Sequence, residues 1–164
     1  MRYWFISALL LLFLSCQNNN GDDKEVSGQD DRIQFLFPQF PEYQFMGLKL
    51  GMGLDEVINI LNKKGFEQNE HAENQYINKK EGLDVILTGG DNFLGFKVFM
   101  MADQDYKGKS EYLDFFSSLA TEKSTSEEFS VFYFQNSDQD FKLTVFDQAD
   151  VNTIRLNFEL KSKH

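Results

Sequence analysis

The sequence predicts an α+β domain in which two helices pack on an antiparallel sheet. Two segments repeat apolar residues at the i, i+3, i+4, i+7 spacing of an amphipathic helix. Each is followed by short segments in which apolar and polar residues alternate, separated by turn-forming residues. The expected order is an edge strand, a helix, four strands, a second helix and three strands. This repetition suggests a duplicated unit of one helix and three strands.

The first predicted helix covers 54–64. Its core-facing positions are Leu54, Val57, Ile58 and Leu61. Acidic residues occupy its first turn and lysines its last, which suits the helix dipole. Gly65 follows, where helices commonly end in a left-handed residue. Upstream, Pro38 and Pro41 predict an edge strand or a packed lead-in, because proline cannot donate a ladder hydrogen bond.

The second predicted helix covers 109–123, with Tyr112, Phe115, Phe116 and Leu119 on its apolar face. The predicted strands are 66–70, 75–79, 83–88, 93–101, 129–135, 140–147 and 151–160. In the last of them, apolar residues from Ile154 to Leu160 alternate with polar residues from Arg155 to Lys161. This strand is therefore expected to have one buried and one solvated face.

The N-terminus has the layout of a secretion signal. Arg2 precedes a nearly unbroken apolar run over 3–14, shorter than the roughly 20 residues that a spanning helix needs. Ser15 then precedes Cys16, the single cysteine of the chain. This arrangement resembles a bacterial lipoprotein signal. The resemblance implies that 1–15 are removed, that Cys16 carries palmitate or a related acyl chain, and that the protein is held at the outer membrane, facing the periplasm or the cell surface.

Residues 16–32 predict a lipidated cysteine followed by a flexible acidic tether. After Cys16 this stretch holds four Asp and one Glu, with Val26 as its one aliphatic residue. Such a segment buries too little apolar surface to offset its chain entropy. Apolar residues and periodic patterns begin at Ile33, so 33–164 is expected to be a single domain, large enough for a core of its own.

Composition excludes several classes of protein. Acidic residues outnumber basic ones 26 to 16, and the formal net charge is −10, which argues against binding nucleic acid. One Cys and two His cannot build an all-protein zinc framework of Cys and His ligands, an iron–sulfur site or a disulfide framework within one chain. We therefore expect no cofactor.

A short segment resembles a known family of envelope lipoproteins. In 47–61, Gly51 and Met52 precede a helix with Val57 and Leu61 on its inner face. This pattern is similar to the opening of the SmpA/OmlA (BamE-like) lipoprotein domain. The resemblance implies kinship of fold, in a family that assists the assembly of outer-membrane proteins. Gly53 stands where the family has a Thr or Ser helix cap.

One acidic segment has part of the spacing of a calcium loop. Asp103, Asp105 and Asp114 fall at positions 1, 3 and 12 of an EF-hand, and Gly108 falls at position 6. Lys107 occupies a ligand position, however, and places a cation where calcium would bind. A strand-to-helix loop is therefore the favoured interpretation, with these three aspartates as weak metal candidates.

No catalytic motif stands out. His71 lies in a polar stretch where a solvated turn residue is the more common role. There is no Gly-x-Ser-x-Gly elbow and no phosphate-binding loop after Gly53. A hydrolase that uses His71 with carboxylates stays an open alternative, and no residue is assigned as catalytic.

The aromatic content suggests an interaction surface. Two aromatic groups are larger than a small core needs, and core packing is the competing interpretation. The candidate residues are Phe35, Phe37, Phe40, Tyr43, Phe132 and Phe134. The favoured function is a lipid-anchored, non-enzymatic module that binds another envelope protein. A small-ligand or calcium-binding protein, or a hydrolase, are the alternatives.

Overall fold

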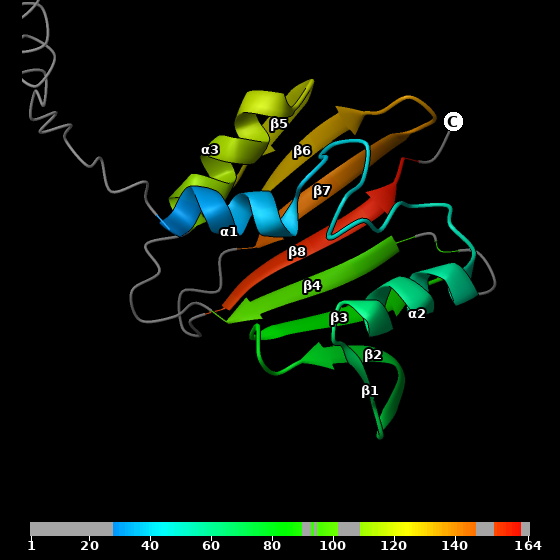
Figure 1. Ribbon diagram of the computed structural model, residues 1–164. Helices are drawn as coiled ribbons and strands as arrows, with labels where there is room; N and C mark the ends of the chain where they lie inside the picture. Colours follow the sequence, from blue (N-terminus) through cyan, green and yellow to red (C-terminus); the bar gives the residue numbers. More distant parts are fainter. Residues whose placement is uncertain (1–27, 90–92, 94, 102–108, 147–152, 162–164) are drawn as a thin grey trace, which may run out of the picture.

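The computed structural model describes residues 28–89, 93, 95–101, 109–146 and 153–161. These residues form an eight-stranded antiparallel sheet and three helices (Figure 1). The helices are α1 (Gly28–Leu36), α2 (Leu54–Lys63) and α3 (Lys109–Leu119). The strands are β1 (Glu67–Asn69), β2 (Ala72–Asn78), β3 (Leu83–Thr88), β4 (Gly95–Met101), β5 (Glu122–Thr125), β6 (Phe129–Gln135), β7 (Asp140–Phe146) and β8 (Thr153–Leu160).

The predicted α+β fold, in which two helices pack on a sheet, is wrong, because the domain contains much more strand than helix. About 46% of the structure is strand and about 23% is helix, so a single large sheet dominates the domain. One physical reason is that the edge strand β5 is short, polar and fully exposed, and hydrophobic alternation does not detect such a strand.

Two meanders meet in the middle of the sheet. The strand order is β1-β2-β3-β4-β8-β7-β6-β5, so each half is a helix followed by four consecutive strands, not three. The halves join through β4 and β8, where Val98 lies opposite Leu156. The duplicated unit of one helix and three strands is therefore wrong as predicted.

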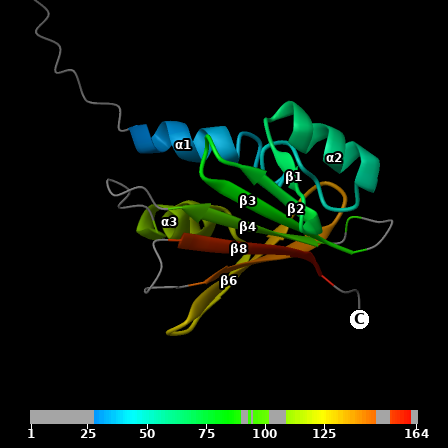
Figure 2. The ribbon, with the colours of Figure 1, turned by 90° about the horizontal axis from the view of Figure 1, so that it is seen from below.

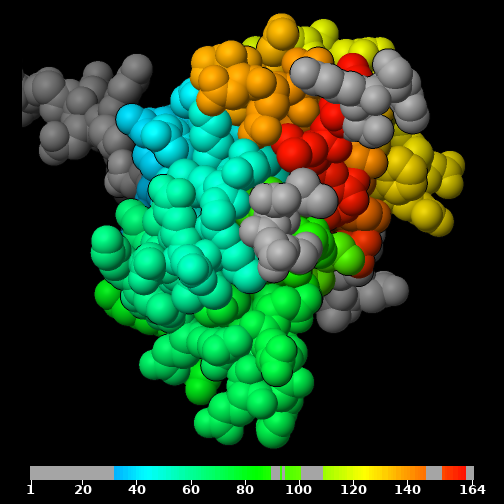
Figure 3. All heavy atoms as spheres, turned by 90° about the vertical axis from the view of Figure 1, so that its right-hand side faces the viewer, coloured from blue at the N-terminus to red at the C-terminus, as the bar shows by residue number. Residues whose placement is uncertain are grey.

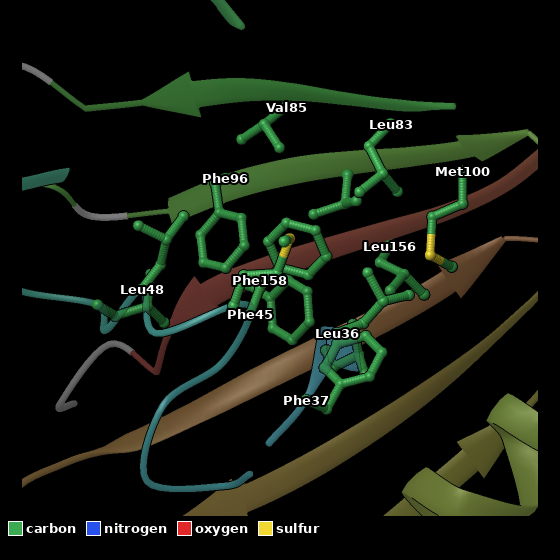
Figure 4. Packing of buried hydrophobic residues seen from close by; sticks show 14 of the residues in the cluster. Leu36, Phe37, Phe45, Leu48, Leu83, Val85, Phe96, Met100, Leu156 and Phe158 are labelled. Carbon is green, nitrogen blue, oxygen red and sulfur yellow. The ribbon is translucent and has the colours of Figure 1, made fainter. Parts of the chain in front are cut away.

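The helices lie on one face of this sheet and enclose the core. Figure 2 shows α1 and α2 on the same side, with β6 and β8 at the other side of the molecule. The ring of Phe116 on α3 lies 6.1 Å from that of Phe132 on β6, which places α3 on this face too. Phe96 and Phe158 stack at 4.7 Å and pack with Phe45 from the segment before α2 (Figure 4).

Helix α2 and its C-terminal cap confirm the helix that was predicted over 54–64. Val57 and Leu61 are buried, and Asp55 and Glu56 occupy the first turn. Gly65 follows the helix with φ +82, and its N–H donates to the carbonyl of Asn62. The N–H of Phe66 donates to the carbonyl of Leu61. These two bonds form a Schellman motif, which ends the helix.

No strand forms around Pro38 and Pro41; the segment that carries them packs on the core, as the lead-in alternative predicted, and helix α1 precedes it. The helix begins at Gly28, inside the predicted tether, and places Ile33, Leu36 and Phe37 in the core. Arg32 donates to the Glu81 carboxylate at 2.6 Å and to the Glu81 carbonyl at 2.7 Å. The i, i+3, i+4 spacing of the three apolar residues was the available signal, but the polar start of the helix masks it.

Helix α3 is shorter than predicted. It ends at Leu119, and Glu122–Thr125 leaves the helix to pair with β6 as β5. All four residues of β5 are exposed. This strand has no apolar pattern, and backbone hydrogen bonds to β6 hold it in the sheet. The helical periodicity over 109–123 therefore could not reveal it.

The segment between α1 and α2 is pinned to the far half of the sheet. Lys49 bonds Glu42 at 2.8 Å and also bonds Asp138, while the Ser137 hydroxyl donates to Glu42 at 2.8 Å. The Gln139 amide donates to the Leu50 carbonyl at 2.7 Å. Figure 3 shows this cyan segment against the orange strands at the β6–β7 turn. These contacts hold the segment between α1 and α2 in place over the core.

Candidate functional site

The alternation of side chains divides the sheet into two faces. Val98, Leu156 and Val145 form one row across β4, β8 and β7, and all three are fully buried on the helix side. One residue further along each strand, the side chains point the other way, where no described helix lies. We call this surface the open face. On β3, β4, β8, β7 and β6 it includes Asp84, Ile86, Lys97, Phe99, Arg155, Asn157, Glu159, Asp140, Lys142, Thr144, Phe146, Phe129, Val131 and Tyr133.

A row of aromatic rings around a cation crosses the open face. Phe99 lies opposite Arg155, and Arg155 lies opposite Phe146. The guanidinium carbon of Arg155 is 3.6 Å from the centroid of the Phe146 ring, a cation–π contact. Phe129 continues the row and is 38% exposed, with its ring 6.0 Å from that of Phe146. The row offers apolar surface with a positioned cation inside it.

Charged side chains flank this row. Lys142 lies 2.7 Å from Glu159, and its hydrogen bond is the main reason why the pKa of Glu159 lies below its ordinary value. The charge of Lys97 lowers that pKa further. Lys161, directly after β8, lies 5.2 Å from the centroid of the Tyr133 ring. The flanks therefore combine cations with aromatic surface.

The open face carries charges of both signs. Its cations are Lys97, Lys142, Arg155 and Lys161, and strand register and alternation place Glu67, Asp84, Glu122, Asp140 and Glu159 on the same face. Like the chain as a whole, in which acidic residues outnumber basic ones 26 to 16, this face is not cationic.

Asp84 is an acidic group at one end of the aromatic row. It lies opposite Phe99 in the row that leads to Arg155. Burial raises its pKa above the ordinary value, and a hydrogen bond from Gln75 opposes that shift. Asp84 Oδ1 and Arg155 Nε are both buried and have no hydrogen-bond partner within the described residues. The row therefore holds polar atoms for which the described residues supply no hydrogen-bond partner.

The two edges of the sheet are poor sites for adding a strand. β1 and β5 have three and four residues, and their sequences are Glu-Gln-Asn and Glu-Lys-Ser-Thr. The pairing of β1 with β2 is also irregular between Gln68 and Asn69. Short, charged and irregular edges are how natural sheets avoid pairing with other chains. The open face is a more suitable contact surface than either edge.

The most strongly perturbed titratable groups lie on the other side of the molecule. Hydrogen bonds from Lys49 first and Ser137 second lower the pKa of Glu42 to about 2. Hydrogen bonds to Asp138 and Glu42 raise the pKa of Lys49 above its ordinary value. Perturbed pKa values can mark active sites, but structural ion pairs produce them too. Here every partner joins the 41–52 segment to the β6–β7 turn, which is a structural role.

The structure separates the aromatic residues predicted as an interaction surface. Phe37, Phe132 and Phe134 are each 2% exposed, and Phe40 packs against the same core. Phe35 is 44% exposed on α1. Tyr43 is half-buried in the following loop. A ring buried in the core cannot contact a partner, so three of the six candidates serve folding, and the set does not form one surface.

The weak metal and catalytic candidates do not come together in the part of the chain that the structure describes. Asp114 is exposed on α3, whereas Asp103 and Asp105 lie outside the described residues. His71 is exposed in the β1–β2 turn, where its N–H donates to the Asn69 side chain at 2.9 Å. Over the described ranges, no group of three or more His, Cys, Asp or Glu side chains could hold a metal ion. Cys16 also lies outside them.

Sequence reasoning missed the open face as a unit. The alternation of Arg155 to Lys161 on β8 correctly predicted a solvated face for that one strand. Phe99 and Phe146 gave no such signal, because their strands are rich in apolar residues on both faces. Only the register, which sets them on either side of Arg155, identifies the row.

Comparison with known proteins identified no relative. No protein-family model matches the chain, and neither the curated proteins nor the solved structures give a match. None of the helices in the described ranges is long and apolar enough to cross a membrane.

Proposed function

We propose that this protein is a lipid-anchored module of the bacterial cell envelope that binds another envelope protein and catalyses no reaction. Acylated Cys16 holds it at the outer membrane, and the folded domain makes the contact. The observation that supports binding is the open face, where one whole side of an eight-stranded sheet carries aromatic and charged side chains with no described helix over it.

The anchor is supported by the N-terminal pattern alone. Arg2, the apolar run over 3–14, Ser15 and Cys16 stand in the order of a lipoprotein signal. A single acyl chain binds a membrane only marginally, whereas two or more hold a protein there for practical purposes. A domain held in this way meets partners at the membrane surface with a raised effective concentration.

Lipidation is tested by growing cells with an alkyne analogue of palmitate. The full-length chain should incorporate the label, and Cys16→Ala should lose both the label and signal processing. A Cys16→Ala variant that is processed and stays in the membrane fraction contradicts the anchor.

Partner binding is tested by photo-crosslinking in living cells. A photoreactive phenylalanine analogue replaces Phe129 on the open face or Phe35 on α1, which are 38% and 44% exposed. One envelope protein should be captured in near-stoichiometric amount from at least one position, and Cys16→Ala should abolish capture. If neither position gives a specific adduct in repeated experiments, the binding module is contradicted.

A further inference from the structure

The two signs of charge on the open face are separated across the sheet. Strands β1, β2 and β3 contain no Lys or Arg, and they present Glu67, Glu73 and Asp84 on this face. The neighbouring strands β4, β8 and β7, with the residue after β8, present more cations than anions there. These cations are Lys97, Lys142, Arg155 and Lys161, and the anions are Asp140 and Glu159.

The row through Phe99 carries both signs in a fixed order. Asp84 lies opposite Phe99 on one side, and Arg155 lies opposite it on the other. Ile77 lies beyond Asp84, and Phe146 lies beyond Arg155. On either side of β4 the row therefore holds one charged and then one apolar residue, and the two charges are opposite.

A second row repeats this order of charges. Strand alternation puts Glu73 in the row of Thr88, which pairs with Gly95 on β4. On the other side of β4, Gly95 pairs with Glu159, and Glu159 pairs with Lys142. Glu73 is exposed and Lys142 is 40% exposed, and they stand two strands from β4 on opposite sides.

This order of charges makes the open face complementary to itself. When two sheets pack face to face about a two-fold axis along β4, the strands keep their direction and the two sides of β4 are exchanged. Asp84 of one copy then lies over Arg155 of the other, and Glu73 lies over Lys142. By symmetry each pair occurs twice, so the interface gains four contacts between opposite charges.

The same axis also brings apolar side chains together. Ile77 of one copy lies over Phe146 of the other, and the two Phe99 rings meet at the axis. An unfavourable contact is that the two Lys97 side chains face each other there. The charge of Glu159, on which Lys97 acts within one copy, offsets part of this repulsion.

The membrane anchor suits this arrangement. Figures 1 and 2 show α1 starting near the end of the sheet where β8 begins. An axis along the strands keeps this end the same for both copies. Residues 17–27 separate Cys16 from α1, and a flexible chain of that length reaches about 20 Å on average. Both acylated cysteines can therefore enter one membrane, which raises the effective concentration of the second copy.

We propose that the open face binds a second copy of this chain, with the two sheets aligned about a two-fold axis along β4. This proposal rests on the proposed function and names the envelope protein that occupies the open face. A partner of a single charge sign would match only one part of the face, whereas a second copy matches both parts. Strand addition is disfavoured, because β1 and β5 are short and polar.

The first test reverses the exposed pair, Glu73 and Lys142. Full-length chains in neutral detergent carry one of two fluorescent labels, and energy transfer between the labels measures self-association. Glu73→Lys alone or Lys142→Glu alone turns two attractions into two repulsions in each dimer, so each should weaken self-association about tenfold. A wild-type chain that stays monomeric at about 100 μM, or reversals that change nothing, would overturn the proposal.

Mixing the two variants separates a self-complementary face from a loss of folding. A dimer of one Glu73→Lys chain and one Lys142→Glu chain regains both attractive pairs, so the mixture should associate within about threefold of wild type. The matched control is Glu127→Lys and Lys64→Glu, which make the same charge changes at exposed positions outside the strands. A mixture as weak as the separate variants, or an equal loss in the control, overturns the proposal.

Lys97 tests the position of the axis. Lys97→Gln removes the repulsion between the two copies at β4 and should tighten self-association about threefold. A structural role for Lys97 within one copy would give no such gain. Weaker self-association of Lys97→Gln would contradict an axis along β4.

Photo-crosslinking in cells separates this proposal from the proposed function. Phe129 of one copy lies over Glu67 of the other, so the photoreactive analogue at Phe129 should capture a second copy of the chain. Capture of a different envelope protein there, or a specific adduct from Phe35 alone, overturns the second copy and leaves the proposed function standing. If neither position captures any protein, the proposed function fails as well. Binding to phosphatidylglycerol vesicles without self-association also overturns the second copy.

Discussion

The two faces of the sheet use the same strands for opposite purposes. On the helix side, Phe96, Phe158 and Leu156 are completely buried, and the rings stack on one another. On the open face, the neighbouring positions hold Lys97 and Asn157, which are half-buried. Burial of the side chains on one face of each strand therefore supplies the free energy of folding. The other face is left to present charge and aromatic surface without loss of the fold.

Substituting one phenylalanine on each face should give the largest contrast. Phe158→Ala removes a ring from the closed core and should lower the free energy of unfolding by about 3–5 kcal/mol. Phe129→Ala removes a ring that is already 38% exposed and should cost less than about 1 kcal/mol. Denaturant titration followed by circular dichroism measures both. Equal losses would mean that the open face is as closed as the core.

The buried side-chain amide of Gln44 bonds two backbone groups of the segment between α1 and α2, which covers the core. Its Oε1 accepts from the Leu50 N–H at 2.8 Å, and its Nε2 donates to the Pro41 carbonyl at 2.9 Å. Gln44→Ala leaves both backbone groups unpaired and should cost about 1–3 kcal/mol in unfolding free energy. Gln135→Ala is the control at an exposed position, with an expected change within about 0.5 kcal/mol. A similar loss for both would mean that water replaces the Gln44 bonds.

Two carboxylates should give pH effects of opposite sign. The pKa of Glu42 falls from 4.5 to about 2 in the fold, so its stabilisation is present above 4.5 and is lost as the pH drops toward 2. Burial raises the pKa of Asp84 above 3.8, so the fold binds that proton more tightly than the unfolded chain does. The charged form of Asp84 therefore costs stability above its folded pKa.

The matching substitutions are Glu42→Gln and Asp84→Asn. At pH 7, Glu42→Gln should destabilise the protein and Asp84→Asn should stabilise it. For Glu42→Gln the difference from wild type should shrink toward pH 2, and for Asp84→Asn it should shrink as Asp84 becomes protonated. Unfolding midpoints measured across this pH range check both directions. A destabilised Asp84→Asn variant at pH 7 would show that the Gln75 bond outweighs burial.

The ion pair on the open face should have the smallest effect on folding. Lys142 and Glu159 are 40% and 41% exposed, so solvent screens their attraction. A double-mutant cycle with Lys142→Ala and Glu159→Ala should give a coupling free energy below about 1 kcal/mol. A larger value would mean that the charges of the open face hold the sheet together.

Local signals in the sequence predicted part of the fold well. Gly65 ends α2 in the conformation that its position predicted, because a Schellman motif depends only on neighbouring residues. The alternation on β8 predicted its two faces for the same reason. By contrast, β5 carries no apolar residue, and α1 begins with polar residues, so neither gave a usable pattern.

The candidate site was less predictable than the fold. Phe132 and Phe134 looked like surplus aromatic surface, yet both pack on Phe116 of α3 or its neighbours in the core. Phe99 and Arg155 come from strands about fifty residues apart in sequence and become neighbours only when β4 pairs with β8. A pairing between distant strands sets which charges and rings share a face.

The sequence by itself determined helix α2 with its C-terminal cap and the alternation of β8, because each depends on residues close along the chain. Only the tertiary structure decided that β4 joins β8, that α1, α2 and α3 cover one face, and that Arg155 lies on Phe146 on the other. The physical reason is the separation along the chain over which each interaction acts. Capping and periodicity act within a few residues, whereas strand register and helix docking are settled by burying the apolar surface of the whole domain.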